Sequence, residues 1–227
     1  MDLIEIGNIL SLELIGNKAR ILAKAVSFGC IVPYGVVVTT EAFNVRKIPV
    51  DLHRFLHEKV SVRSSCTLED LKGTSFAGKY KSFTDVKPCD VSDRIIDVWD
   101  SLSDNCEYLD RLGISYSNAN MAVIVQKMIY GTSGVTFTAD PDTGDECVIT
   151  YYGNCPCSKI VEGKINPNEA IYTEKDGLKI EGDNKDKLLQ VSKECLRLQK
   201  LMGYPVDVEW CWDNAMDNFQ VLQVRPI

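Results

Sequence analysis

The stretch PVDVEWCWDNAMDNFQVLQVRPI, residues 205–227, has the pattern of two strands joined by a polar loop. Side chains alternate between the two faces of a strand, so Asp207 and Glu209 share one face of the first strand. On the second strand, Gln223 and Arg225 likewise share a face. Carboxylate, amide and guanidinium groups are costly to bury unless they are paired or hold a ligand. The hairpin therefore predicts a polar cluster that something has to fill.

Two interpretations of this cluster are open. Glu209 and Gln223 carry oxygen donors of the kind that suit Mg²⁺, which takes one or two protein oxygens and completes its shell with phosphate and water. Arg225 could then hold the same phosphates through two parallel hydrogen bonds. The alternative is a structural Glu–Arg pair within the hairpin, and for one isolated hairpin that alternative is the simpler.

Composition bounds the class of protein. The chain has 227 residues, of which 45% are hydrophobic, so it can bury a core in one or two domains. Its net charge of −7 argues against nucleic acid or an anionic membrane as the main partner. No apolar run approaches the roughly 18 residues that span a bilayer, and MDLIEIGNIL lacks the layout of a signal peptide. With nine scattered cysteines that favour reduced thiols, we expect a soluble cytoplasmic protein.

Periodicity and turn residues predict helices and strands in mixed order. Helices are expected at 15–29, from Thr39 or Thr40, at 46–58, at 91–112 and at 185–202. Strands are expected within 30–43 and at 59–65, 121–129, 133–141 and 146–153, followed by the closing hairpin. Asn17 is expected to cap the first helix and Gly29 to end it. Because strand and helix do not alternate strictly, the α+β class is favoured.

Three other stretches could contact an anion, although neither a GxxxxGK[ST] loop nor a GxGxxG turn is present. Lys18 falls in the first turn of its predicted helix, where backbone N–H groups favour an anion; a solvated lysine is the commoner case. Arg63, in VSVRSS, is either an anion ligand or an exposed structural arginine. LKGTSFAGKY, residues 71–80, either closes over phosphates through its glycines or is an ordinary surface loop.

Two weaker patterns indicate no site. His53 and His57 are four residues apart and form at most half of a metal site, so a solvated helix face is the simpler interpretation. Cys155 and Cys157 have no second pair at the spacing of a zinc site, and we interpret them as structural.

Five segments occur in an order that is specific, although each alone is weak. They are GNKARILAKAVSFGCIVPYGVVVTTEAF, VSVRSSCTLEDLKGTSFAGKY, MAVIVQKMI, SGVTFTADPDTG and PVDVEWCWD…FQVLQVRPI. In this order the chain resembles the N-terminal ATP-binding domain of the family of phosphoenolpyruvate synthase, pyruvate phosphate dikinase and rifampicin phosphotransferase. The resemblance implies an α+β ATP-grasp fold with two lobes that clamp the nucleotide. Residues 1–120 would form a shortened N-terminal lobe and residues 121–227 the C-terminal lobe.

For the N-terminal lobe, the resemblance implies that Lys18 and Arg63 hold the ATP phosphates. A phosphate-covering loop near residues 73–79 would include Thr74, Ser75 and Gly78. Together with Arg225 from the other lobe, Lys18 and Arg63 would be the catalytic side chains.

For the C-terminal lobe, the resemblance places Gln126 and Met128 on the strand that lies against adenine, with the backbone near Met128 as an adenine contact. Glu209 and Gln223 would bind Mg²⁺, and Arg225 would stabilise the transferring phosphates. Mg²⁺ and ATP would then fill the polar cluster of the closing hairpin.

The sequence departs from the family in several places. The region between TTEAF and VSVRSS is shorter, GNCPC at 153–157 replaces a GLGE stretch, and Lys79 stands where the family often has glutamine. Family members continue into a swivelling domain with a phosphorylated histidine and then a substrate domain. The two histidines here, His53 and His57, match no such motif. We therefore expect a full phosphohistidine relay to need a partner.

The expected function is that of a phosphotransferase module. It would bind Mg-ATP and donate a phosphoryl group to a histidine on a separate protein or to a small-molecule acceptor. Two alternatives remain at this point: a non-catalytic nucleotide-sensing module, and an ATP-grasp ligase that forms an acyl phosphate. The fold permits the ligase chemistry, but likeness of fold alone is weak support for it.

Overall fold

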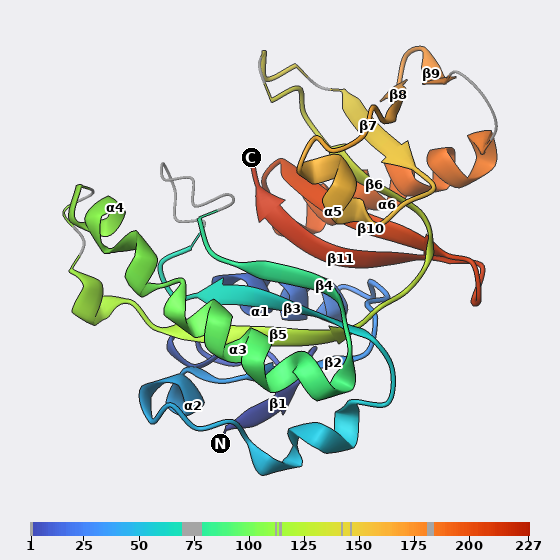
Figure 1. Ribbon diagram of the computed structural model, residues 1–227. Helices are drawn as coiled ribbons and strands as arrows, with labels where there is room; N and C mark the ends of the chain where they lie inside the picture. Colours follow the sequence, from blue (N-terminus) through green and yellow to red (C-terminus); the bar gives the residue numbers. More distant parts are fainter. Residues whose placement is uncertain are drawn as a thin grey trace. The chain divides into compact units, whose positions relative to one another are not determined.

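The computed structural model of the chain forms two compact units, each with its own antiparallel sheet (Figure 1). It describes residues 2–69, 79–111, 113, 115–141, 143–145, 147–180 and 184–227. The first unit is Met1–Lys24 with Pro33–Met128, and the second is Ala25–Val32 with Ile129–Ile227.

The first unit has a five-stranded sheet in the order β1-β2-β5-β3-β4. Its strands are β1 (Leu3–Glu5), β2 (Gly35–Val38), β3 (Val60–Cys66), β4 (Ser82–Val86) and β5 (Met121–Lys127). Its helices are α1 (Leu12–Ser27, whose last turn belongs to the second unit), α2 (Thr40–Asn44), α3 (Val91–Asp100) and α4 (Cys106–Arg111). Short 3₁₀ turns are η1 (Val50–Phe55), η2 (Pro88–Asp90), η3 (Ser103–Asn105) and η4 (Tyr116–Asn118). Valine-rich runs form the central strands, because β-branched side chains fit a pleated surface that is covered on both faces.

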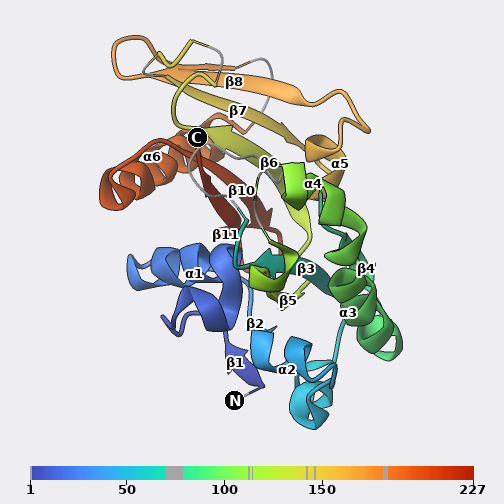
Figure 2. The same cartoon turned by 90° about the vertical axis from the view of Figure 1, so that its left-hand side faces the viewer.

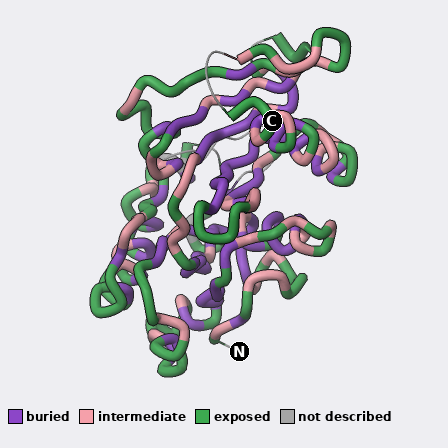
Figure 3. Tube along the Cα trace, turned by 90° about the vertical axis from the view of Figure 1, so that its right-hand side faces the viewer, coloured by how far each residue is buried: buried purple, intermediate pink, exposed green. Residues whose placement is uncertain are grey.

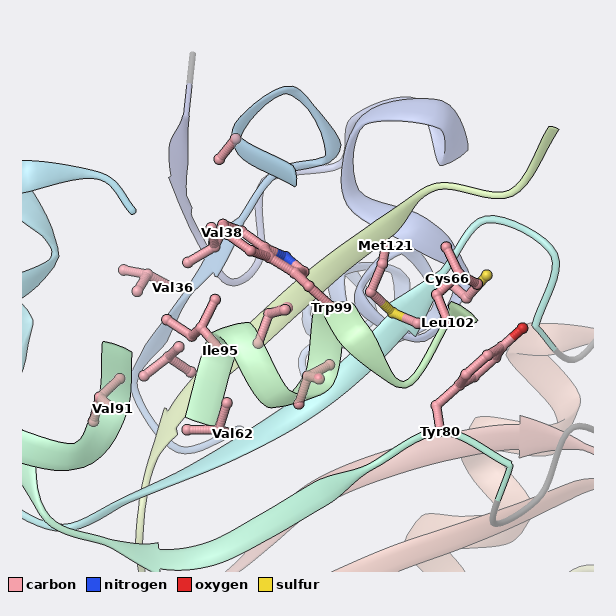
Figure 4. Close-up of a cluster of buried hydrophobic side chains, with 14 of the residues drawn as sticks. Val36, Val38, Val62, Cys66, Tyr80, Val91, Ile95, Trp99, Leu102 and Met121 are labelled. Atoms are coloured by element: carbon pink, nitrogen blue, oxygen red, sulfur yellow. The ribbon is translucent and has the colours of Figure 1, made fainter. Parts of the chain in front are cut away.

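Alternation along these strands divides the core of the first unit into two layers. On one face, Val62 belongs to a cluster with Trp99 of α3, and Figure 4 shows the Trp99 ring lying close to valine side chains of the sheet. On the other face, Ile124 belongs to a cluster with Ile15 of α1. Figure 2 shows α1 and α3 on opposite sides of this sheet.

A glycine allows α1 to lie against the end of β3. Gly16 has φ 71° and ψ 173°, so α1 consists of two helical pieces that meet at this residue. A Cβ atom here would lie 1.8 Å from the carbonyl oxygen of Ser65, an approach that only glycine permits. Immediately after it, Asn17 and Lys18 enter the main helix beside the end of β3.

The second unit has a six-stranded sheet in the order β11-β10-β6-β7-β8-β9. Its strands are β6 (Gly131–Phe137), β7 (Val148–Gly153), β8 (Asn168–Thr173), β9 (Gly177–Ile180), β10 (Val206–Asp213) and β11 (Asn218–Pro226). Its helices are α5 (Cys157–Val161) and α6 (Lys185–Met202). The apolar stripe of α6, including Leu188 and Leu198, is buried, and Figure 2 shows the helix along one face of the sheet. On that face the Trp210 indole donates to the hydroxyl of Thr136 at 2.9 Å.

Most predicted elements are confirmed, and two helices are corrected. The helix expected at 91–112 is interrupted: α3 ends at Asp100, and α4 follows the η3 turn. Ser101 is the physical reason, because its hydroxyl donates to the Val98 carbonyl and its own carbonyl accepts from the Asn105 amide. The helix expected at 46–58 is the short 3₁₀ helix η1. Five further elements are not among those predicted, and they are short and mostly half-exposed: β1, β4, β8, β9 and α5.

The division between the units differs from the one expected after residue 120. Strand β5 lies inside the first sheet, paired with β2 on one side and β3 on the other, and the chain leaves the first unit between Met128 and Ile129. The segment Ala25–Val32 belongs to the second unit, where the Val221 N–H donates to the Ile31 carbonyl at 2.8 Å.

Burial follows the sheets, and Figure 3 shows buried residues concentrated along the strands. The nine cysteines are thiols rather than disulfides, as expected. Within the described ranges, the chain has no helix with the length and apolar character needed to cross a membrane.

Candidate functional site

Lys18 is held in place, so the solvated-lysine interpretation is wrong. Its side chain is 12% exposed, and its ammonium nitrogen lies 2.6 Å from a carboxylate oxygen of Glu69. The same nitrogen donates to the hydroxyl of Ser64 at 3.1 Å. Lys18 thus contributes a positive charge to a corner that is formed by the start of α1 and the end of β3.

Glu69 is the centre of this corner, although no motif in the sequence marks it. Its side chain is 1% exposed and accepts hydrogen bonds from the Ser64 hydroxyl at 3.4 Å and the Cys66 N–H at 3.2 Å. Its main-chain carbonyl accepts from the Asn17 amide at 2.8 Å. The signal in the sequence is slight: an acidic residue three positions beyond the end of a strand, where its side chain can turn back to the backbone.

Asn17 links α1 to this corner and has another role than the predicted one. Besides donating to Glu69, its side-chain oxygen accepts from the Arg20 guanidinium at 2.9 Å. The helix was predicted to start at a cap formed by Asn17. Instead, the non-helical conformation of Gly16 separates the main helix from a short helical piece before it.

Arg63 lies on β3, on the face of the sheet that α1 covers. It stands opposite Ile124 of β5, which packs with α1, whereas its neighbour Val62 faces α3. On the same face, the Ser65 hydroxyl accepts from the Ala19 N–H at 3.0 Å. Helix α1, which carries Lys18, therefore covers the face of the sheet on which Arg63 lies, while the Lys18 ammonium group itself reaches Ser64 at the end of β3.

Gln126 and Met128 are engaged within the first unit. The Gln126 side chain is buried, and its amide donates to the Pro33 carbonyl at 3.1 Å. The Met128 N–H donates to the Lys59 carbonyl at 3.0 Å. These contacts fix the end of β5 just before the chain passes into the second unit.

The structure does not test the predicted phosphate-covering loop. Thr74, Ser75 and Gly78 lie outside the described residues. Lys79, which follows them, is exposed, and its carbonyl accepts from the Asn105 amide at 2.7 Å.

The closing hairpin pairs the polar residues of its two strands with one another, on the shared faces that alternation predicts. Asp207 stands opposite Arg225, and Glu209 stands opposite Gln223. The register shifts after Glu209, so that Trp210 pairs with Val221. The Asp207–Arg225 and Glu209–Gln223 pairs lie before this shift, so the four polar residues share one face of the hairpin.

The salt bridge in the hairpin is an Asp–Arg pair rather than the Glu–Arg pair of the structural alternative. The Arg225 guanidinium contacts the two carboxylate oxygens of Asp207 at 3.1 Å and 2.8 Å, which is a bidentate geometry. Asp207 therefore fixes the plane of the guanidinium, while Glu209 and Gln223 lie buried one pair further along the strands.

Glu209 and Gln223 suit a Mg²⁺ ion that takes its remaining ligands from phosphate and water, rather than a metal held entirely by protein side chains. No group of three or more His, Cys, Asp or Glu residues suited to a metal occurs in the described part of the chain. Directly opposed residues on antiparallel strands have Cβ atoms about 4.5–5.5 Å apart, so these two oxygen donors can share one ion. Mg²⁺ commonly completes such a shell with phosphate and water.

Thiols next to both clusters are neutral. Burial raises the pKa of Cys66 to about 11, beside the Lys18–Glu69 pair. Burial also raises the pKa of Cys211, which follows Glu209 on β10. The charges in these clusters are therefore carboxylates and cations. Elsewhere, the Cys157 thiol donates to the Gly134 carbonyl at 3.2 Å, which is consistent with a structural role.

Comparison with known proteins adds a family and a fold. Residues 44–187, more than half of the chain, match the family described as "Pyruvate phosphate dikinase, AMP/ATP-binding domain". The rifampicin phosphotransferase of Bacillus subtilis is 30% identical over 201 residues, which covers 74% of this chain and 23% of that protein. The phosphoenolpyruvate synthase of Aeropyrum pernix is 30% identical over 239 residues, covering 78% and 29%. The chain thus spans about a quarter of the length of these relatives.

Among solved structures, D-alanyl-alanine synthetase A from Vibrio cholerae aligns with a TM-score of 0.50 at 9% sequence identity. The alignment covers 93% of this chain and 55% of that one. A likeness at this identity concerns the fold alone, and it agrees with the α+β ATP-grasp fold that the sequence predicts.

Proposed function

Because the chain belongs to the pyruvate phosphate dikinase AMP/ATP-binding domain family, we propose that it binds Mg-ATP and donates a phosphoryl group. The acceptor is a histidine on a separate protein or a small molecule. The observation that carries the proposal is the register of the closing hairpin, which sets Glu209 opposite Gln223 and Asp207 opposite Arg225 on one face. A relative named for phosphoryl transfer to rifampicin supports the small-molecule acceptor.

In the hairpin, Glu209 and Gln223 would hold Mg²⁺, which when bound neutralises phosphate charge. Arg225 binds a phosphate oxygen and stabilises the negative charge that develops during transfer. Asp207 is a positioning residue in this scheme. Its bidentate contact keeps the guanidinium in one orientation before the nucleotide arrives, so that less side-chain freedom is lost on binding.

In the first unit, Lys18 of α1 and Arg63 of β3 bind phosphate oxygens. An ammonium group has three donors, and Glu69 and Ser64 take two of those of Lys18, so the same group can also contact a phosphate. Glu69 is therefore proposed as the positioning residue for Lys18. Thr74, Ser75 and Gly78 would cover the phosphates, as the family resemblance implies.

Adenine would lie near the end of β5, with Gln126 and Met128 as the neighbouring residues. Because the Met128 N–H already donates to the Lys59 carbonyl, a backbone contact with adenine would use the Met128 carbonyl group. The amide of Gln126, bonded to Pro33, would support the strand rather than the base.

Calorimetric titration with ATP, with and without Mg²⁺, tests the proposal. We expect binding that needs Mg²⁺ and weakens ten- to a hundredfold in Arg225→Ala, since a hydrogen bond to a charged group is worth about 1.5–3 kcal/mol. Arg94→Ala is the control, because Arg94 forms an exposed ion pair with Asp97 on α3. A wild-type chain that binds no ATP would overturn the proposal.

Product analysis separates this function from the two alternatives. ³¹P NMR of the chain with Mg-ATP and an acceptor should show a phosphorylated acceptor together with ADP or AMP. Binding without any product would indicate a nucleotide sensor, and ADP release that needs both a carboxylate and an amine would indicate a ligase. The family match favours phosphoryl transfer over both.

A further inference from the structure

The first unit contains a pocket that the proposed function does not use. Its volume is about 440 Å³, within the range of roughly 300–1,000 Å³ of small-molecule sites. It lies where the segment after η1 meets the ends of β2, β3 and β5, and Val60 and Val125 contribute apolar surface to it.

This pocket lies on the opposite face of the sheet from Arg63, one of the candidate phosphate ligands. Val60 and Val125 belong to the core cluster that faces α3. Arg63 stands opposite Ile124, which faces α1, and Gln126 is one residue from Val125 and so points away from it. A ligand in this pocket would therefore not occupy the side of the sheet that carries Arg63 and Gln126.

Two aromatic rings form one wall of the pocket. The ring centroids of Tyr34 and Phe55 are 6.0 Å apart, with the planes tilted by 31°. Tyr34 is 52% exposed, although most of its ring is apolar. An aromatic ligand laid against these rings would bury that surface and gain the offset contacts that aromatic rings favour.

Cations form the rim of the pocket. Arg54, Lys59 and Lys127 line it together with one acidic residue, Glu58, although the chain as a whole carries a net charge of −7. Each of the three cations is in an exposed ion pair: Arg54 with Asp51, Lys59 with Asp85 and Lys127 with Glu58. Exposed pairs of this kind contribute about 0–1 kcal/mol, so they compete weakly with a bound anion.

We propose that this pocket binds a small aromatic anion, a ring system that carries one carboxylate, sulfonate or phosphate group. The ring lies against Tyr34 and Phe55, over Val60 and Val125. The anionic group lies at the rim near Lys59 and Lys127. The site is separate from the nucleotide site, and it exists whether or not the chain transfers phosphate.

A pair of fluorescent probes tests the charge requirement. 8-Anilino-1-naphthalenesulfonate and N-phenyl-1-naphthylamine share their rings, but only the first carries an anion. Titrated into the full chain, the sulfonate should bind with one-to-one stoichiometry and at least tenfold more tightly than the neutral probe. Saturating Mg-ATP should not displace it. Equal affinity for both probes, displacement by ATP or absence of binding would each overturn the proposal.

Matched variants locate the probe. Tyr34→Ala and Lys127→Ala should each weaken sulfonate binding at least tenfold, and Tyr34→Phe should retain it. Tyr130→Ala is the control for the first, because Tyr130 is also 52% exposed but does not line the pocket. Lys81→Ala is the control for the second, because the Lys81 and Lys127 side chains are 48% and 47% exposed and both are in ion pairs. Equal losses in variants and controls would show adventitious binding.

Discussion

The start of α1 in the first unit and the closing hairpin of the second unit hold a cation in different ways. In the first, Lys18 contacts Glu69, whose side chain is 1% exposed and also binds the end of β3. In the second, Arg225 contacts Asp207 across a strand pair, with side chains 18% and 12% exposed. The first pair depends on a helix docking on a sheet, and the second depends only on strand register.

The difference shows which cluster is more vulnerable. The Lys18–Glu69 pair stabilises the packing of α1 on β3 as well as positioning a phosphate ligand, since Asn17, Ser64 and Cys66 all bond to Glu69. The Asp207–Arg225 pair lies in a hairpin with a full ladder of backbone hydrogen bonds. Substitutions in the corner should therefore reduce folding stability, whereas substitutions in the hairpin should mainly reduce ligand binding.

The largest expected effect is that of Gly16→Ala. A Cβ atom would lie 1.8 Å from the Ser65 carbonyl oxygen, and the backbone conformation is one that only glycine adopts readily. Strain and overpacking each cost about 1–3 kcal/mol, so we expect a loss of roughly 3–5 kcal/mol in the free energy of unfolding, measured by urea denaturation. Gly29→Ala is the control, because Gly29 has φ 84° but nothing within 4 Å, and it should cost about 1–2 kcal/mol. Equal losses would contradict the docking argument.

Glu69→Ala should destabilise the chain more than Asp207→Ala. Removing one partner of a buried pair costs about 3–5 kcal/mol, and the less buried Asp207 should cost roughly 1–3 kcal/mol. The double variant Lys18→Ala/Glu69→Ala should recover part of the first loss, because no unpaired ammonium group remains. The measurement is the unfolding free energy of all four proteins. A larger loss for Asp207→Ala would reverse the comparison.

Glu209→Gln should change metal dependence rather than folding. The substitution keeps an oxygen donor but removes its negative charge, so it should raise the Mg²⁺ concentration needed for ATP binding about tenfold, or roughly 1.4 kcal/mol. ATP titrations across a Mg²⁺ series, and after addition of EDTA, would measure it. Asp213→Asn is the control on the same strand, since Asp213 bonds to Ala215 and Gln220 within the hairpin. The same Mg²⁺ requirement in Glu209→Gln as in wild type would remove Glu209 from the metal site.

The smallest expected effect is a loss of folding stability at alkaline pH, and it arises from the buried thiol of Cys66. Its pKa is raised by burial from 9.0 to about 11, so above pH 9 the unfolded thiol loses its proton while the folded thiol keeps it. The native state then binds more protons than the unfolded state, and stability falls as pH rises from 9 towards 11. At pH 9.5 the loss should be about 0.8 kcal/mol for this one group. The drop in the urea midpoint from pH 7.5 to pH 9.5 should be larger in wild type than in Cys66→Ala. Cys89→Ala, at an exposed thiol, is the control and should show the wild-type drop. Identical pH slopes in all three proteins would contradict the buried-thiol argument.

Much of the fold follows from patterns that the sequence shows directly. The runs GVVV and MAVIVQK form strands, and the stripe from Leu188 to Met202 forms a helix, because burial of one face imposes a period on the residues. The edge strands β1, β4 and β9, and β8 next to an edge, carry no such period, so the sequence does not predict them. The helix at 91–112 was overextended, because side chains of Ser101 and Asn105 bond to the backbone at a point where the apolar pattern continues.

The candidate site, too, could be predicted from the sequence only in part. Alternation within residues 205–227 determines that Asp207, Glu209, Gln223 and Arg225 share a face, because strands joined by a short turn meet in a register that local geometry imposes. The partners were not determined in this way. The carboxylate that holds Arg225 is Asp207, and the predicted alternative was a Glu–Arg pair.

The residue pattern alone predicts the strands with a clear period, the main helices and the polar face of the hairpin, since each depends on the steric period of a short segment. The pairing of Glu69 with Lys18, and the contact of Asn17 with a carbonyl 52 residues away, become visible in the folded chain alone. So does the position of β5 within the first sheet. These contacts depend on the close approach of α1 to β3 at Gly16, which no periodicity encodes, because it results from how two distant segments pack.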